Sequence, residues 1–416
     1  MRNGGKERMD EKRLGEEVAR KSAQEFCRET GYREKMREDE KMRWLRMQLF
    51  KAYMEARKAK RRTSDEQIFE MAEFENIEIL AEEIVARTYV AGRGISFIVR
   101  DPVVREIFAA PFRDRVVHHF LYNMVAEWWD RRFIFDSYSC RKEKGTLFAI
   151  ERLQKNIRRA TRDGAREATA ITMDVKGYFM SLDRKKLLKR IDWGLDGQFR
   201  RLPWLQEILH FLWEVTIMDD PTEHVELRGD LGAWKDLPAS KSLFCQPEGK
   251  GIVIGNLSSQ LLSNIFLDIL DRYIVLELGN KYYGRYVDDF YIIVENDKLD
   301  KILDERVLIR KKLMSLGLQL HPKKIHVQNV RKGVKFVGVM VYDNKVLPGE
   351  RMQRKFKKAT WAFLCGKKNV EIVQSYLGLF SQQDAGKWLE KCVREFGMSG
   401  IGELVREVKT GIFLSR

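Results

Sequence analysis

Apolar residues recur along much of the chain at the spacing of helices, and they cluster in several short stretches typical of strands. A helix is predicted from about Asp65 to Thr88, and residues 92–102 and 104–109 predict a β-hairpin. Further helices are predicted from Phe112 onward and over 147–162, 197–217, 256–278, 298–317 and 350–416. Further strands are predicted over 170–183, 282–294 and 334–342, and irregular structure is predicted over 219–248. Helices and strands without a regular alternation indicate an α+β fold.

Composition and charge indicate a globular protein with a polyanionic partner. The formal net charge is +16 and the isoelectric point is near 9.5. This surplus favours nucleic acid as the partner, with simple solubility as the alternative explanation. No run of eighteen apolar residues predicts a transmembrane helix, and no apolar signal core follows the first residues, so we expect a cytoplasmic protein without a membrane partner. Five scattered cysteines suit a reducing compartment.

Two adjacent acids, Asp288 and Asp289, lie between two apolar, β-prone runs. This pattern predicts a β-hairpin with carboxylates at its tip. Neighbouring carboxylates repel one another at neutral pH, so the pair favours a bound cation, and hard oxygen ligands favour Mg²⁺. The alternative is a polar turn between two strands, because aspartate is a common turn residue.

A third acid, Asp174, ends an apolar strand and precedes the turn-forming Gly177. With Asp288 and Asp289 it would complete a three-carboxylate site for two Mg²⁺ ions, about 3.5–4 Å apart, which suits in-line phosphoryl transfer. Mn²⁺ accepts the same ligands. The alternative for Asp174 is a helix N-cap or a turn residue.

These motifs resemble those of reverse transcriptases. Tyr-Val-Asp-Asp at 286–289 resembles the YxDD box, residues 174–179 resemble the first palm motif, and residues 251–260 resemble the palm motif between them. Other segments resemble the fingers (104–117 and 135–146), the next palm motif (318–325) and the primer-grip hairpin (333–338). Ile-Gly-x-x-x-Ser-Gln at 254–260 replaces the common Gln-Gly and Ser-Pro pairs. It is similar to the motif of bacterial reverse transcriptases from diversity-generating retroelements.

The resemblance implies a right-hand polymerase architecture with fingers, palm and a helical thumb. We expect a basic helical N-terminal extension over 1–64, fingers and palm over 65–345, and the thumb over 346–416. The implied partners are a template RNA, the cDNA or primer, and dNTPs. The family often works with a basic accessory protein, for which the chain itself gives no direct evidence.

The resemblance also implies roles for single residues. Asp174, Asp288 and Asp289 would bind the metal ions, assisted by the Val175 carbonyl. Six residues would bind the nucleotide: Arg105, Phe179, Ile254, Gly255, Gln260 and Lys324. Arg105 would contact the triphosphate, Phe179 would act as a steric gate against a ribose 2′-hydroxyl, and the backbone at Gly255 would approach the nucleotide. Gln260 would lie near the templating base, and Lys324, or alternatively Lys323, would donate a proton to pyrophosphate. The nucleic-acid-binding set is Arg113, Arg115, Arg141, Arg354 and Lys358. The alternatives are core packing for Phe179, a surface salt bridge for Arg105 and solvated charges for the lysines and thumb residues.

One substitution in the middle motif bears on copying accuracy. A glutamine at position 254 would hydrogen-bond the incoming nucleotide, whereas Ile254 offers only shape. Losing a polar contact worth about 1 kcal/mol weakens discrimination several-fold. The resemblance therefore implies RNA-directed DNA synthesis with frequent errors opposite template adenine. The alternative for Ile254 is a packed strand residue. The alternatives for the function are a defence reverse transcriptase acting against phage and a catalytically dead RNA-binding scaffold.

Overall fold

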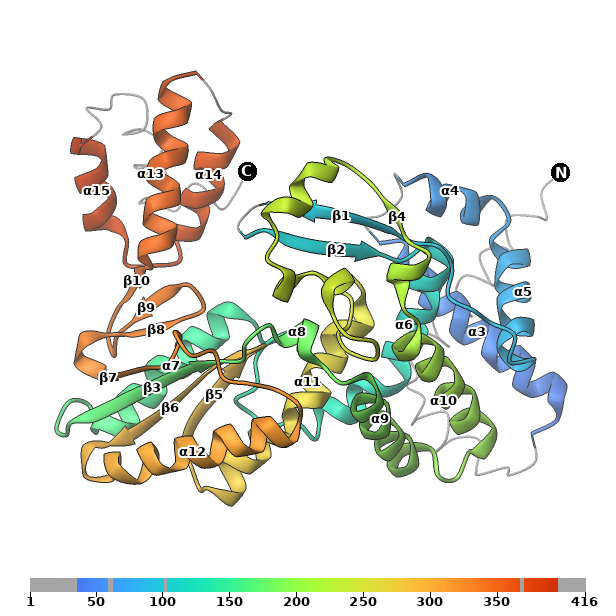
Figure 1. Cartoon of the computed structure of the whole chain (residues 1–416), viewed down its shortest axis with the longest axis horizontal. Coiled ribbons are helices and arrows are strands. Elements are labelled where there is room, and N and C mark those ends of the chain that lie inside the picture. Colours follow the sequence, from blue (N-terminus) through green and yellow to red (C-terminus); the bar gives the residue numbers. More distant parts are fainter. Residues whose placement is uncertain (1–35, 59–62, 101–102, 367–369, 396–416) are drawn as a thin grey trace, which may run out of the picture. The chain divides into compact units, whose positions relative to one another are not determined.

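The computed structural model describes residues 36–58, 63–100, 103–366 and 370–395. The predicted N-terminal extension and thumb therefore lie partly outside the described residues. Helices and strands are both present, in agreement with the predicted α+β class (Figure 1). Within the described part, none of the helices is long and apolar enough to cross a membrane.

The chain divides into two compact units, each built from separate stretches of sequence. The first takes Met1–Phe133 and Gly177–Asp268, and the second takes Ile134–Lys176 and Ile269–Arg416. The division into three consecutive segments that the sequence favours stays a prediction.

The first unit combines a layer of helices with a small sheet in the order β2-β1-β4. Strands β1 and β2 pair antiparallel, which confirms the predicted hairpin, and the short β4 adds in parallel to β1. The elements are α3 (Glu38–Ala56), α4 (Ser64–Met71), α5 (Glu73–Val85), β1 (Ile95–Val99), β2 (Arg105–Ala109), α6 (Phe112–Asp130), α8 (Tyr178–Ser181), α9 (Arg184–Phe199), α10 (Pro203–Met218), β4 (Glu226–Leu227) and most of α11 (Leu257–Arg272).

Two helical predictions in this unit need correction. The helix predicted over 65–88 is interrupted at Ala72, where the Asn76 amide donates to the Phe69 carbonyl at 2.9 Å and satisfies a group freed by the break. The helix predicted over 197–217 is two helices, because α10 begins at Pro203, a favoured first helical residue. Helix α9 was not predicted. Its Gly194 lies against the Trp129 ring, where a side chain would collide.

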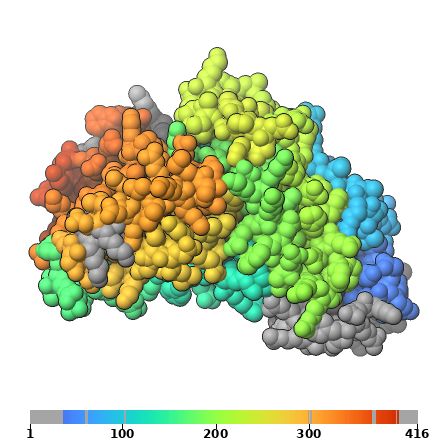
Figure 2. Space-filling view, turned by 60° about the horizontal axis from the view of Figure 1, so that its bottom comes forward, coloured from blue at the N-terminus to red at the C-terminus, as the bar shows by residue number. Residues whose placement is uncertain are grey.

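The stretch over 219–248 is irregular, as predicted, and contains short 3₁₀ turns besides β4. Figure 2 shows this yellow-green segment at the surface. A buried carboxylate, Glu106 on β2, anchors it by accepting hydrogen bonds from Trp234 Nε1 at 2.8 Å, Ser242 Oγ at 2.9 Å and the Leu243 N–H at 2.6 Å. The irregular segment is thus fixed to the hairpin by the Glu106 side chain in addition to the short pairing of β4 with β1.

The second unit is built on an antiparallel four-stranded sheet in the order β5-β6-β3-β7. Its core includes Leu153 and Ile157 of α7, Ala170 of β3 and Tyr291 of β6. The elements are α7 (Thr146–Thr161), β3 (Ala168–Asp174), β5 (Tyr282–Tyr286), β6 (Asp289–Glu295), α12 (Leu299–Ser315), β7 (His326–Asn329), β8 (Val334–Phe336), β9 (Val339–Val341), β10 (Val346–Pro348), α13 (Glu350–Leu364), α14 (Val370–Phe380) and α15 (Gly386–Glu395).

The strand predicted over 334–342 is a hairpin of β8 and β9, joined by β10 in a second sheet. Its turn uses Val337 and Gly338, both with positive φ. Helices α13 to α15 agree with the predicted helical tail as far as residue 395, and they pack around Phe356, Leu377 and Phe380.

Candidate active site

The hairpin tip predicted at Asp288 and Asp289 is present. Strands β5 and β6 pair antiparallel up to Asp289, which leaves Val287 and Asp288 as a two-residue turn. Strand β6 also pairs with β3, and in this register Asp174 lies opposite Asp289. The Val175 N–H donates to the Asp288 carbonyl at 3.0 Å and ties the end of β3 to the turn. Acids from two distant parts of the chain therefore lie at one end of the sheet.

Burial and mutual repulsion shape the electrostatics of these acids. The side chain of Asp174 is buried, and Asp289 is partly buried beside it. Burial, and then the charges of Asp288 and Asp174, raise the pKa of Asp289 to about 7. Crowded carboxylates of this kind favour a positive charge nearby.

One such charge comes from Lys324, whose Nζ lies 2.6 Å from Asp174 Oδ2. Its segment is fixed to the end of β3, because the His321 N–H donates to the Asp174 carbonyl at 2.7 Å. The Lys324 N–H in turn donates to the His321 carbonyl at 3.1 Å. Lys323 is exposed, and its backbone N–H donates to His321 Nδ1 at 3.2 Å. Of the two lysines, Lys324 is the one whose ammonium reaches the acids.

The chemistry of the donor set fits a hard divalent cation. Carboxylate oxygens are the ligands that Mg²⁺ prefers, and a bound cation would offset the burial and the charges of Asp288 and Asp174 that raise the pKa of Asp289. The side chains are not gathered around one point, since no three His, Cys, Asp or Glu side chains in the described ranges lie close enough to hold a metal ion. The backbone thus brings the candidate ligands together, while the Asp174 carboxylate is bonded to Lys324.

In the first unit, Phe179 and Ile254 belong to one apolar cluster. Two backbone bonds fix them: the Ile252 N–H donates to the Phe179 carbonyl, and the Phe108 N–H donates to the Ile254 carbonyl, both at 2.9 Å. The cluster has buried members Phe108, Met180 and Leu243 and partly buried members Phe179, Val225, Val253 and Ile254. Both predicted nucleotide-contacting side chains are therefore packed on one side and partly exposed.

The other predicted nucleotide-binding residues of this unit differ in setting. Arg105 is exposed at the start of β2, and Gln260 is exposed in the first turn of α11. Gly255 has φ of 139°, and a Cβ there would collide with the Phe108 carbonyl. The close approach of Gly255 to the backbone of β2 requires glycine in the structure itself, and the predicted approach to the nucleotide stays a prediction.

Residues 104–341 match the family model of the reverse transcriptase (RNA-dependent DNA polymerase) domain. The match spans more than half of the chain and contains all the candidate metal-binding and nucleotide-binding residues. The chain belongs to the reverse transcriptase family. It is therefore an RNA-directed DNA polymerase of the nucleotidyltransferase class, with a palm-and-fingers fold, an RNA template and dNTP substrates. No curated protein matches the chain.

The four arginines and one lysine predicted to contact template and primer lie in two settings in this reverse transcriptase. Arg354 and Lys358 are exposed one turn apart on α13. The other three bond within their own units: Arg113 pairs with Glu83, Arg115 donates to the Ala110 carbonyl at 2.8 Å, and Arg141 donates to the carbonyls of Ile134 at 2.7 Å and Ser137 at 2.9 Å. For these three, the observed contacts are structural, and nucleic-acid binding stays a prediction.

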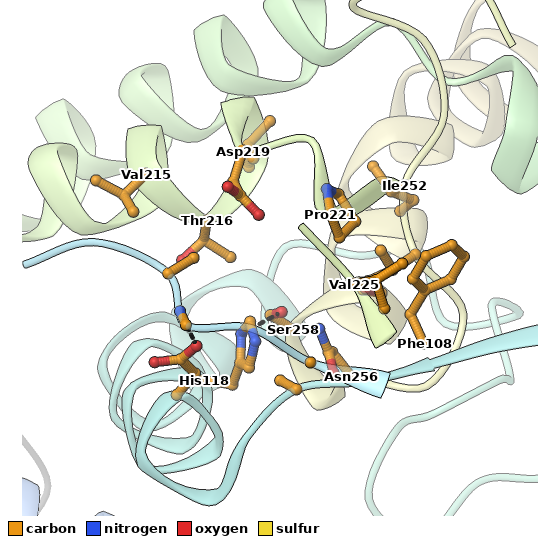
Figure 3. A pocket seen from close by; sticks show the side chains of 18 of the residues that line it. Phe108, His118, Val215, Thr216, Asp219, Pro221, Val225, Ile252, Asn256 and Ser258 are labelled. Carbon is orange, nitrogen blue, oxygen red and sulfur yellow. Dashed lines mark hydrogen bonds between the residues drawn. The ribbon is translucent and has the colours of Figure 1, made fainter. Parts of the chain in front are cut away.

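The reverse transcriptase also has a cavity within its first unit. Figure 3 shows His118, Thr216, Asn256 and Ser258 among its lining side chains, together with apolar neighbours such as Ile252. His118 Nδ1 lies 2.9 Å from Ser258 Oγ. Burial, with smaller effects from His119 and Arg115, lowers the pKa of His118 from 6.5 to about 4. This histidine is therefore neutral at physiological pH.

The lowered pKa of His118 predicts a loss of stability in mild acid. Between pH 6.5 and 4 the unfolded chain binds a proton at this position and the folded chain does not, so folding stability falls as pH falls. At pH 5 the expected loss is about 2 kcal/mol relative to pH 7.5. Thermal melting of wild type and His118→Gln at both pH values measures it, because glutamine does not titrate. An equal decrease in Tm for both proteins would contradict this assignment.

Sequence reasoning missed two buried charged residues: Glu106, which anchors the irregular segment, and Arg285, whose Nη1 donates to the carbonyl of Val287 at the hairpin tip. Each lies on a short strand next to a residue already chosen for its chemistry: Glu106 follows Arg105, and Arg285 closely precedes Asp288. A charged residue inside a short β-prone run was the available signal, but the partners Ser242 of Glu106 and Ser137 of Arg285 lie far away in sequence.

Proposed function

We propose that this reverse transcriptase carries out error-prone cDNA synthesis for a diversity-generating retroelement. The observation that carries the proposal is the setting of Ile254, whose partly exposed side chain belongs to the same apolar cluster as Phe179. An apolar side chain at this position makes no hydrogen bond that reports on the geometry of an incoming nucleotide. Discrimination between correct and incorrect base pairs then rests on shape, which is the weaker criterion.

The proposed chemistry assigns each residue a task. Asp174, Asp288 and Asp289, with the Val175 carbonyl, would hold two divalent ions, which when bound activate the primer 3′-hydroxyl and neutralise the leaving pyrophosphate. Lys324 Nζ would donate a proton to the pyrophosphate oxygen. In the first unit, exposed Arg105 would bind the triphosphate and Phe179 would exclude a ribose 2′-hydroxyl. On α13, which we assign to the thumb, Arg354 and Lys358 would bind the template–primer backbone.

Copying of template adenine tests the proposal. On a primed RNA, wild type is expected to misincorporate more often opposite adenine than opposite the other bases. Ile254→Gln is expected to reduce this misincorporation about 5-fold, because one polar contact worth about 1 kcal/mol is restored. Single-nucleotide incorporation with each dNTP, one template base at a time, measures the ratio of incorrect to correct insertion.

Val253→Gln is the matched control, since it introduces the same amide one residue earlier in the same cluster. It is expected to leave the insertion ratio unchanged. Wild-type enzyme that copies adenine as accurately as the other bases would contradict the proposal and favour the defence role. A template repeat beside an adenine-mismatched variable repeat in the neighbouring genes would support it.

A further inference from the structure

An arginine with no exposed surface lies just before the catalytic turn. Arg285 and Asp271 are both 0% exposed, and their side chains form a two-bond ion pair, with Nε to Oδ1 and Nη2 to Oδ2 both at 2.7 Å. Tyr283 also donates to Asp271 Oδ1 at 2.5 Å. Burying two charges costs free energy unless they are paired and hydrogen-bonded in good geometry. The ion pair with Asp271 therefore fixes the orientation of the Arg285 guanidinium.

The remaining nitrogen of this guanidinium reaches the turn itself. Arg285 Nη1 donates to the Val287 carbonyl at 2.8 Å, and the Val287 N–H donates to Ser139 Oγ at 3.2 Å. Val287 has φ of 56°, in the left-handed region that β-branched residues strongly disfavour. Both polar backbone groups of this strained residue are therefore held by side chains from outside the turn.

The support for these side chains comes from the segment over 136–139. The Arg285 N–H donates to the Asp136 carbonyl at 2.9 Å, and the Tyr138 N–H donates to the Arg285 carbonyl at 3.0 Å. Ser137 Oγ accepts a further bond from Arg285 Nη2 at 3.2 Å. This segment thus adds a short parallel bridge to β5 and places Ser139 against the turn.

We propose that Arg285 and Ser139 are positioning residues that hold Val287 in its left-handed conformation and thereby set the positions of the Asp288 and Asp289 carboxylates. The inference rests on the proposed metal-binding role of these two acids. Without the two bonds, Val287 relaxes toward negative φ and redirects the residue that follows it. Displacing a reacting group by about 1 Å costs on the order of 100-fold in rate.

The test combines variants of the two positioning residues, Ser139 and Arg285, with a variant of the strained residue Val287. Ser139→Ala and Arg285→Lys are expected to lower the single-turnover rate of incorporation on primed RNA by about 10- to 100-fold. The KM for dNTP and the Kd for primer–template are expected to change less than about 2-fold, since neither residue binds substrate. Adding Val287→Asn to Ser139→Ala is expected to restore at least about 5-fold of the rate, because asparagine tolerates the left-handed conformation without the bond.

Arg190→Lys is the matched control for Arg285→Lys. It weakens another largely buried ion pair, with Asp268 at 2.9 Å, and is expected to lower Tm without changing the rate per folded molecule. Equal losses for Ser139→Ala with and without Val287→Asn, or losses that merely follow the folded fraction, would overturn the inference. Asp288→Asn distinguishes failure of the positioning role from failure of the proposed metal-binding role. If Asp288→Asn remains active, the proposed role of the acids fails. If it is inactive while Ser139→Ala and Arg285→Lys are fully active, only the positioning role fails.

Discussion

Asp288→Asn is expected to lower the single-turnover rate of dNTP incorporation on a primed RNA by roughly 1,000-fold, equivalent to about 4 kcal/mol of transition-state stabilisation. Asparagine has nearly the same shape and suits the same turn, so the two-residue connection between β5 and β6 is retained. What disappears is one negative ligand from a set in which Asp174 and Asp289 are already neighbours. The measurement is a quench-flow time course with Mg²⁺ and, separately, with Mn²⁺.

Glu295→Gln supplies the control for charge removal on the same strand. Glu295 ends β6 at the opposite end from Asp289 and lies 3.5 Å from Arg166, so its loss leaves the hairpin tip intact. Its rate is expected to remain within about 2-fold of wild type, as for a partly exposed ion pair. Incorporation by Asp288→Asn at a rate close to that of Glu295→Gln, with either metal, would refute the assignment of Asp288.

The hairpin tip was predictable because its signals are local. Apolar, β-prone runs on both sides of Asp288 and Asp289 define two strands, and the acids between them mark the turn. The end of β3 at Asp174 followed from the same kind of pattern. That Asp174 joins Asp288 and Asp289 in one site was expected from these local signals together with the spacing of known motifs. The register adds that Asp174 lies opposite Asp289, and the shared metal site stays a prediction.

The parts that escaped prediction depend on contacts between residues far apart in sequence. Ser139 reaches Val287, and Glu106 reaches Ser242, across separations that no periodic pattern encodes. The left-handed conformation of Val287 was equally hidden, because valine is the opposite of the residue that such a turn normally favours. Tertiary hydrogen bonds here override the backbone preference of the residue itself, and such bonds leave no local pattern in the sequence.

Lys324→Met is the second substitution with a large expected effect, a fall of about 100-fold in the single-turnover rate with little change in the KM for dNTP. Methionine keeps an unbranched, flexible side chain but lacks the ammonium that lies 2.6 Å from Asp174 Oδ2. Two contributions are lost together: the proposed proton donor to the leaving pyrophosphate, and the positive charge next to the crowded acids.

Lys324→Arg separates the two contributions. Arginine retains the positive charge beside Asp174, but a guanidinium does not give up its proton under working conditions, so the variant is expected to remain slow. Lys323→Met is the matched control from the same turn, and it is expected to have a nearly wild-type rate because the ammonium bonded to Asp174 is that of Lys324. Full activity of Lys324→Arg would assign this lysine to electrostatics alone. A larger loss from Lys323→Met than from Lys324→Met would show that the neighbouring lysine is the proton donor.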